Sequence, residues 1–311
     1  MKKIFYVVMA VCMSLTACNK EEGVFTPKHK IAKMYESYSY HSEIWNSELG
    51  YWEYSDETTP KYLSEKWTWN GKTLSSIQFY NEDGSPWFTE NFEYENKRIS
   101  KVTHSSQSEW GLQGRWEFSY DKNGLVKADL GDGKDIYVGV DFTHNKNGKI
   151  SEVRWTYFED NYKKEVFPLQ TSILRLILPS DNQQILKRAE AKMLECVSAK
   201  GVNIYTQKYE WDGDNVKRVT DDDGWQVEYE YDNMTNPLYG LLDNHLFGDG
   251  NLYDYVISKN NVVKEQRGNW NRDYTYRYDK KLPIVKICVD KDETNSYHRY
   301  TDTHTTYYEY E

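Results

Sequence analysis

Cysteine is scarce in this sequence, with four residues among 311. Cys12 and Cys18 lie in or directly after an N-terminal apolar segment, so only Cys196 and Cys288 remain for the rest of the chain. Those two supply at most one disulfide. They could pair in an oxidising compartment or remain buried thiols, and the sequence leaves both possibilities open.

Basic residues are in the minority, with 39 Lys and Arg against 49 Asp and Glu. Removing Lys2 and Lys3 with the N-terminal segment leaves 37 basic residues and a net charge of −12. Binding to phosphates requires a clustered basic patch, whereas the lysines here are dispersed among acids. We therefore expect no nucleic acid partner.

Motifs for known chemistry are missing as well. There is no Gly-x-Ser-x-Gly, no glycine-rich phosphate loop, and no pair of histidines at metal-ligand spacing. The aspartates around Asp212 and Asp221–Asp223 do not match a calcium loop and are typical of solvated turns. We predict no metal, no cofactor and no catalytic residue, although 49 acids leave a carboxylate pair for glycoside hydrolysis open.

No apolar run is long enough for a spanning helix. Residues 1–17 carry two lysines, an apolar stretch and small residues directly before Cys18, which is typical of a lipoprotein signal peptide. The alternative is an ordinary secretory signal with an incidental cysteine. We predict that Cys18 is lipidated, that 18–30 is a flexible tether, and that the protein is an outer-membrane lipoprotein held at the membrane by this anchor. Residues 19–22 are also similar to a short acidic signal for display at the cell surface, so either face of the membrane remains possible.

Aromatic residues are abundant, and they alternate with polar ones. Tyr274, Tyr276 and Tyr278 show this spacing, which places one apolar and one polar face on a β-strand. Turn sequences such as Asp121–Gly124 follow these strands. Each turn precedes an apolar pair three residues apart, and this offset predicts a bulge or a twist at the start of each second strand. These pairs are Leu74/Ile77, Ile99/Val102, Leu125/Ala128, Ile150/Val153, Val216/Val219 and Ile284/Ile287, with a degenerate copy around Val262.

The repeat predicts an all-β fold with a single domain over 31–311. We expect an antiparallel up-and-down meander of repeated hairpins that forms a barrel or a strongly curled sheet. One amphipathic helix is expected to be inserted near 180–201, because Ile185, Leu186, Ala189, Met193 and Val197 recur at helical spacing. Pro179-Ser180 and Gly201 supply its start and stop signals.

The last third of the chain resembles a known group. Tyr229–Asp232, Asn236-Pro-Leu238, Ser258–Lys264 and Tyr274–Asp279 with Pro283 resemble Bacteroidetes lipoproteins of unknown function that are described as having a porin-like fold. The repeat is also similar to the tyrosine-aspartate hairpin repeats of large secreted proteins. The resemblance spans 66–311 and implies an antiparallel barrel in the cell envelope, without assigned catalytic residues. Lys280-Lys-Leu282 departs from the pattern, in which the turn carries a glycine.

Aromatic rings are the remaining indication of function. Trp67 and Trp69 share a strand face, and Trp116 and Trp211 occupy equivalent positions in other hairpins. Flat rings stack on sugars or on apolar peptide groups, although the same rings can simply form the core. We predict a non-catalytic module that binds a glycan or a peptide through these four residues or through the open end of the barrel. A hydrolase with paired carboxylates inside the barrel, and a structural or assembly subunit of an outer-membrane complex, are the alternatives.

Overall fold

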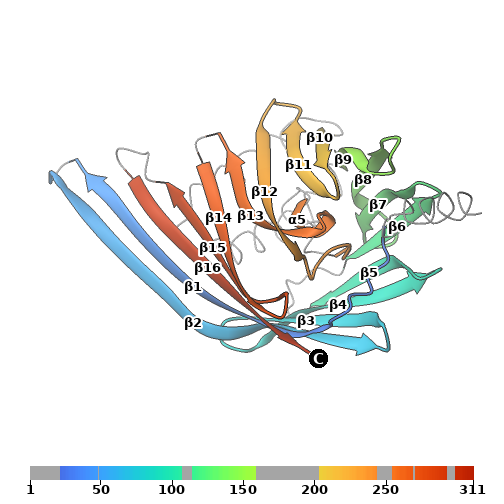
Figure 1. The fold of residues 1–311 in the computed structure, drawn as a ribbon, viewed down its shortest axis with the longest axis horizontal. Helices are drawn as coiled ribbons and strands as arrows, with labels where there is room; N and C mark the ends of the chain where they lie inside the picture. The colour runs from blue at the N-terminus through green and yellow to red at the C-terminus, as the bar shows by residue number, and fades with distance from the viewer. Residues whose placement is uncertain are drawn as a thin grey trace, which may run out of the picture.

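The computed structural model describes residues 22–47, 49–106, 114–158, 203–243, 254–268, 270–292 and 298–311. Sixteen antiparallel strands form a closed barrel, in which each strand pairs with its neighbours in sequence and β1 pairs with β16 (Figure 1). The first eight strands are β1 (Ile31–Asn46), β2 (Tyr51–Asn70), β3 (Thr73–Tyr80), β4 (Pro86–Glu95), β5 (Arg98–Ser106), β6 (Arg115–Asp121), β7 (Gly124–Gly131) and β8 (Ile136–His144). The other eight are β9 (Ile150–Tyr157), β10 (Asn203–Asp212), β11 (Asn215–Asp221), β12 (Gln226–Thr235), β13 (Asn260–Arg267), β14 (Trp270–Asp279), β15 (Leu282–Asp292) and β16 (His298–Tyr310).

The predicted meander of hairpins is confirmed as a closed barrel, but the predicted fold class is wrong about the helix. The helix that the described residues contain is α5 (Asp254–Ile257), a single turn between β12 and β13 and not an insertion near 180–201. Residues 180–201 themselves lie outside the described residues. Helical spacing of apolar residues was therefore not a sufficient basis for including that helix in the fold class.

The predicted bulges are confirmed at six hairpins. In each, the register shifts by one residue at the start of the second strand, as between Thr68/Trp69 of β2 and their partners in β3. The unusual turn after Asp279 also closes normally, because Lys280 and Lys281 both adopt positive φ, of 47° and 81°. Two positive φ values are what a two-residue hairpin turn requires, so lysine takes the place of glycine here without a change of register.

An apolar core fills the side of the barrel formed by β3 to β11. Its members are the inward residues of the hairpins, including five of the predicted apolar pairs, and the largest fully buried side chain is Trp155. The segment after β12 adds Leu238, Leu241, Leu242 and Val256 to the same core. These residues close one end of the barrel, which we call the plugged end. The short turns after the even-numbered strands β2 to β10 lie at this end, and the opposite end is called the far end.

The N-terminal segment enters the plugged end. Phe25 is 1% exposed, and its ring packs against Trp67 and Trp69 with centroid distances of 6.3 and 5.9 Å. The carbonyl of Gly23 accepts a hydrogen bond from the Ile99 amide at 2.8 Å. A Cβ atom at Gly23, where φ is +79°, would overlap the Tyr120 hydroxyl, so this position requires glycine. The described part of the predicted tether, 22–30, is therefore packed onto the barrel.

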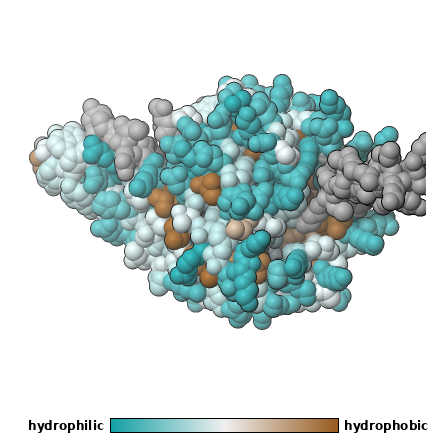
Figure 2. Space-filling view, in the orientation of Figure 1, coloured by the Kyte–Doolittle hydropathy of each residue, from teal (hydrophilic) through white to brown (hydrophobic). Residues whose placement is uncertain are grey.

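The outer wall is hydrophilic. Outward positions on the strands carry exposed charged side chains, among them Glu93, Glu117, Asp141, Arg154, Lys208, Glu210, Glu230 and Arg277. On the face shown in Figure 2, apolar side chains are scattered and do not form a continuous band. Separately, none of the helices in the described ranges is long and apolar enough to span a bilayer.

Candidate functional site

The four predicted tryptophans lie on the inner side of the barrel wall. Trp67 and Trp116 are 4% and 3% exposed and belong to the apolar core. Trp69 and Trp211 are partly buried against that core, and each indole donates a hydrogen bond to a backbone carbonyl of a neighbouring strand. Their packing accounts for all four as structural residues, and their role in ligand binding stays a prediction. Accessible polar side chains lie on the other side of the barrel.

The hairpin of β14 and β15 brings polar side chains to the inner face of the barrel. The expected apolar pair there was Ile284/Ile287, by analogy with Leu74/Ile77. In the structure, Tyr278 pairs with Pro283 as Trp69 pairs with Leu74, so Ile284 takes the bulge position and Lys286 points inward. A shift of one residue moves a whole strand face to the other side of a sheet. Inward positions of β15 are therefore Lys286, Cys288 and Asp290.

Three rows of side chains cross the inner face from β13 to β2, and we call this region the polar lumen. The upper row, nearest the far end, is Glu265, Arg272, Asp290, Asp302, Tyr40 and Glu57. The middle row is Tyr274, Cys288, His304, Tyr38 and Thr59. The lower row is Tyr276, Lys286, Thr306, Glu36 and Tyr62. Sequence reasoning missed these rows, because polar residues at inward positions break the repeat that was used to find them.

A network of ion pairs holds the upper row. The guanidinium of Arg272 lies 3.3 Å from Asp290 Oδ2 and 3.7 Å from Glu265 Oε2. Glu265 also accepts hydrogen bonds from Arg267 Nε at 3.0 Å and from the Tyr274 hydroxyl at 3.1 Å. Both carboxylates are buried. Burying charge is expensive unless it is paired, and Arg272 supplies the charge that these two acids share.

The middle and lower rows combine rings with ionisable groups. The rings of His304 and Tyr38 are tilted against each other with their centroids 4.8 Å apart, and His304 Nε2 lies 3.4 Å from Asp302 Oδ1. His304 keeps 39% of its side-chain surface accessible, whereas Asp302 keeps 4%. In the lower row the Tyr62 hydroxyl donates to Glu36 Oε2 at 3.2 Å. The accessible imidazole shows that the interior next to these rows is open to solvent.

Burial changes the ionisation of several lumen groups. Burial, together with the nearby charge of Glu65, raises the pKa of the Glu36 carboxyl. Burial lowers the pKa of Lys286, but Tyr308, Cys288 and Glu36 outweigh it and the net shift is upward, so the ammonium stays charged. Burial raises the pKa of the Cys288 thiol to about 11, and among the described residues Cys288 is a free thiol. This cysteine is therefore a protonated, unreactive thiol at neutral pH.

Two carboxylates of the upper row face one another. Asp290 and Asp302 are directly opposite on β15 and β16, which places their Cβ atoms about 4.5–5.5 Å apart. Such a pair can bind the hydroxyl or ammonium groups of a ligand, or act together on a glycosidic bond. Within the described ranges, no three His, Cys, Asp or Glu side chains are grouped to hold a metal ion.

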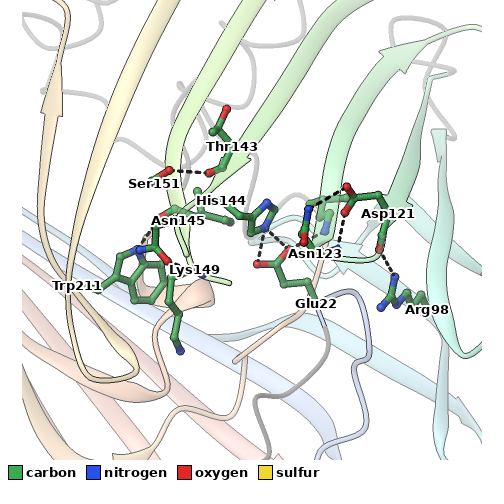
Figure 3. Close-up of polar contacts among 12 residues, drawn as sticks. Glu22, Arg98, Asp121, Asn123, Thr143, His144, Asn145, Lys149, Ser151 and Trp211 are labelled. Atoms are coloured by element: carbon green, nitrogen blue, oxygen red, sulfur yellow. Dashed lines mark hydrogen bonds and ion pairs between the residues drawn. The ribbon is translucent and has the colours of Figure 1, made fainter. Parts of the chain in front are cut away.

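A second polar cluster fixes the N-terminal segment at the plugged end (Figure 3). The carboxylate of Glu22 accepts a hydrogen bond from the Leu125 amide at 2.7 Å, and it lies 3.0 Å from His144 Nε2. The hydrogen bond that His144 donates to Glu22 raises the pKa of His144; burial opposes this shift, and the charges of Glu22 and Asp121 add to it. His144 is therefore more readily protonated in the folded protein than in the unfolded chain.

This contact makes stability depend on pH. Because the pKa of His144 is raised on folding, its contribution is fully present below the unfolded value of about 6.5 and is lost as pH rises through the folded value. We expect urea unfolding to show wild type more stable than His144→Gln at pH 6, with a difference that shrinks towards pH 9. A difference that grows with pH would contradict the assignment.

Comparisons with known proteins identify no family for this chain. No family model matches it, and no curated protein matches it. Among solved structures, a porin-like protein from Bacteroides uniformis is 11% identical, with 90% of this chain and 98% of that chain covered and a TM-score of 0.46. The TcdB2-TccC3-Cdc42 structure is 12% identical over 77% of this chain and 12% of that chain, with a TM-score of 0.29. Pseudomonas putida OprB is 6% identical over 90% and 93% of the two chains, with a TM-score of 0.24. Identities and TM-scores this low transfer neither fold nor function to this chain.

Proposed function

We propose that this protein is a lipid-anchored protein of the cell envelope that captures a polar ligand in the lumen of its barrel. The observation that carries the proposal is the row of charged side chains on the inner face, in which the carboxylates of Glu265, Asp290 and Asp302 are buried around the partly exposed Arg272. A barrel that served only as a scaffold would be more stable with apolar residues there, as on the side of β3 to β11. Polar interiors are retained where a solvated space or a ligand meets them.

The composition of the lumen favours a glycan. Carboxylates outnumber cations in the three rows, and they accept hydrogen bonds from hydroxyl groups. A tyrosine ring beside the accessible imidazole of His304, that of Tyr38, supplies a flat surface for a sugar ring. A peptide is the other ligand class predicted from the sequence, and a basic peptide would match the same carboxylates.

The anchor at Cys18 and the hydrophilic wall support a position on the membrane and not across it. A transmembrane barrel presents an apolar band to lipid, whereas outward positions here include Glu117, Asp141 and Arg154. Lipidation of Cys18 would then hold the barrel at the outer membrane.

A binding experiment with a matched control tests the proposal. The full-length protein in detergent is screened on a glycan array and a peptide array, and the mass of its N-terminal residue is measured on the same sample to check the lipid. We expect Asp302→Asn to weaken ligand binding about tenfold or more, because it removes a buried acceptor charge. Asp141→Asn, on the outer face between Lys127 and Arg154, should bind as wild type does. Equal binding by the two variants would place the ligand outside the lumen.

The facing carboxylates Asp290 and Asp302 favour one second candidate, a glycoside hydrolase. As directly opposed residues their Cβ atoms lie about 4.5–5.5 Å apart, close enough for the two carboxyl groups to flank one glycosidic bond. Incubating the captured glycan with the protein and measuring new reducing ends separates the two functions. Turnover that disappears in both Asp290→Asn and Asp302→Asn would establish the enzyme, and binding without turnover would exclude it.

A further inference from the structure

A groove of about 550 Å³ lies on the outer face at the far end of the barrel. It is bounded by the turn between β11 and β12 and by the turn between β13 and β14. Its lining residues are Asp223, Gly224, Trp225, Gln226, Glu228, Gln266 and Gly268. The wall formed by β12 and β13 separates this groove from the polar lumen, because Glu228 and Gln266 are exposed whereas the adjacent Glu265 is buried inside.

The indole of Trp225 is not needed for the turn that carries it. Asp221 builds this turn, since its Oδ1 accepts the Trp225 amide at 2.8 Å and its carbonyl accepts the Gly224 amide at 3.1 Å. The turn involves only the backbone of Trp225. The side chain is 61% exposed, and it makes no hydrogen bond or ring contact with the described part of the chain. Its large flat face is therefore available to a ligand.

The polar side chains around this ring still have hydrogen-bonding positions that the described residues do not use. Arg218 donates from Nη2 and Nε to Glu228 Oε1, at 2.6 and 2.9 Å. This fixes the carboxylate and leaves its Oε2 without a hydrogen-bond donor among the described residues. The side-chain amides of Gln226 and Gln266 are likewise exposed and not hydrogen-bonded within those residues. One flat ring thus lies beside two amides and one fixed carboxylate oxygen.

We propose that this groove binds a neutral carbohydrate, independently of the polar lumen. The C–H face of a pyranose ring stacks on an exposed indole. Its hydroxyl groups donate to a carboxylate and exchange hydrogen bonds with amides, as Glu228, Gln226 and Gln266 allow. Asp223 and Glu228 give the groove a negative charge that disfavours anionic sugars.

The probe is an array of neutral oligosaccharides presented to the full-length protein, followed by calorimetry with the saccharide that binds best. We expect Trp225→Ala to weaken this binding about tenfold and Gln266→Ala to weaken it less. Tyr54→Ala is the matched control, because Tyr54 is an equally exposed aromatic residue on β2, outside the groove. It should bind as wild type does. All three changes are at exposed positions, so the variants should keep the fold of the wild type.

The outcomes also distinguish the groove from the lumen. Saccharide binding that is lost in Asp302→Asn but unchanged in Trp225→Ala would overturn the groove proposal and leave the lumen proposal standing. Loss in Trp225→Ala alone would support the groove and not the lumen. Binding of peptides only, dependent on Trp225, would refute the assignment to carbohydrate, as would the absence of any saccharide on the array that binds.

Discussion

Replacing Arg272 by methionine is expected to lower the free energy of unfolding by about 3 kcal/mol or more. Arg272 is the cation between two buried carboxylates, Asp290 and Glu265, and its removal leaves their charges inside the barrel with less compensation. Breaking a buried ion pair from one side is strongly destabilising for this reason. Urea unfolding at neutral pH measures the loss.

The loss should shrink at acid pH. At acid pH fewer carboxylates carry charge, so removing the guanidinium leaves less uncompensated charge inside the barrel. The control is Arg218→Met on the outer wall. Arg218 also bridges two carboxylates, Glu210 and Glu228, but both are exposed by more than half. It should cost less than about 1 kcal/mol. Equal losses for the two arginines would show that the lumen is as well solvated as the outer surface.

Replacing Phe25 by alanine is the second change with a large expected effect. A fully buried phenylalanine contributes about 3–5 kcal/mol relative to alanine. The segment 22–30 is held mainly through this ring and through the contacts of Glu22 and Gly23, so the variant should release the segment before the barrel unfolds.

Hydrogen exchange distinguishes release of the segment from global unfolding. In Phe25→Ala, we expect faster exchange at the Ile99 and Leu125 amides, which donate to Gly23 and Glu22, with little change in β14 and β15. Thr26→Ala, at the exposed neighbour of Phe25, serves as the control and should stay within about 0.5 kcal/mol of wild type. Unchanged protection at both amides would show that the segment does not depend on Phe25.

The hairpin repeat was predictable because local signals are sufficient for it. Alternating aromatics define the first strand, turn residues close it, and the offset of Leu74 and Ile77 reveals the bulge. Each of these signals spans fewer than ten residues. Closure of the barrel between β1 and β16 joins the two ends of the chain, and no local pattern could distinguish it from an open, curled sheet.

The polar lumen was not predictable from the same signals. In the hairpin of β14 and β15, the apolar residue Ile284 occupies the bulge position and Lys286 occupies the inward position. The search for apolar pairs three residues apart therefore assigned β15 a register that is wrong by one residue. Counting from the two-residue turn at Lys280-Lys281 would have corrected it, because that turn fixes which residues pair. Phe25 was missed for a different reason. A single aromatic residue in a polar segment has no period, and only its tertiary partners show that it is buried.

The docking of Glu22 and Phe25 also determines which way the barrel would stand on a membrane. With a lipid on Cys18, only three residues lie between the lipidated cysteine and Glu22, and these four steps along the chain span at most about 14 Å. The plugged end would then lie close to the lipid headgroups. Because β1 is sixteen residues long, the far end would lie up to about 50 Å from the plugged end. The far end of the barrel would be directed away from the membrane into the surrounding medium. Bulky polymers could then reach the far end without approaching the bilayer.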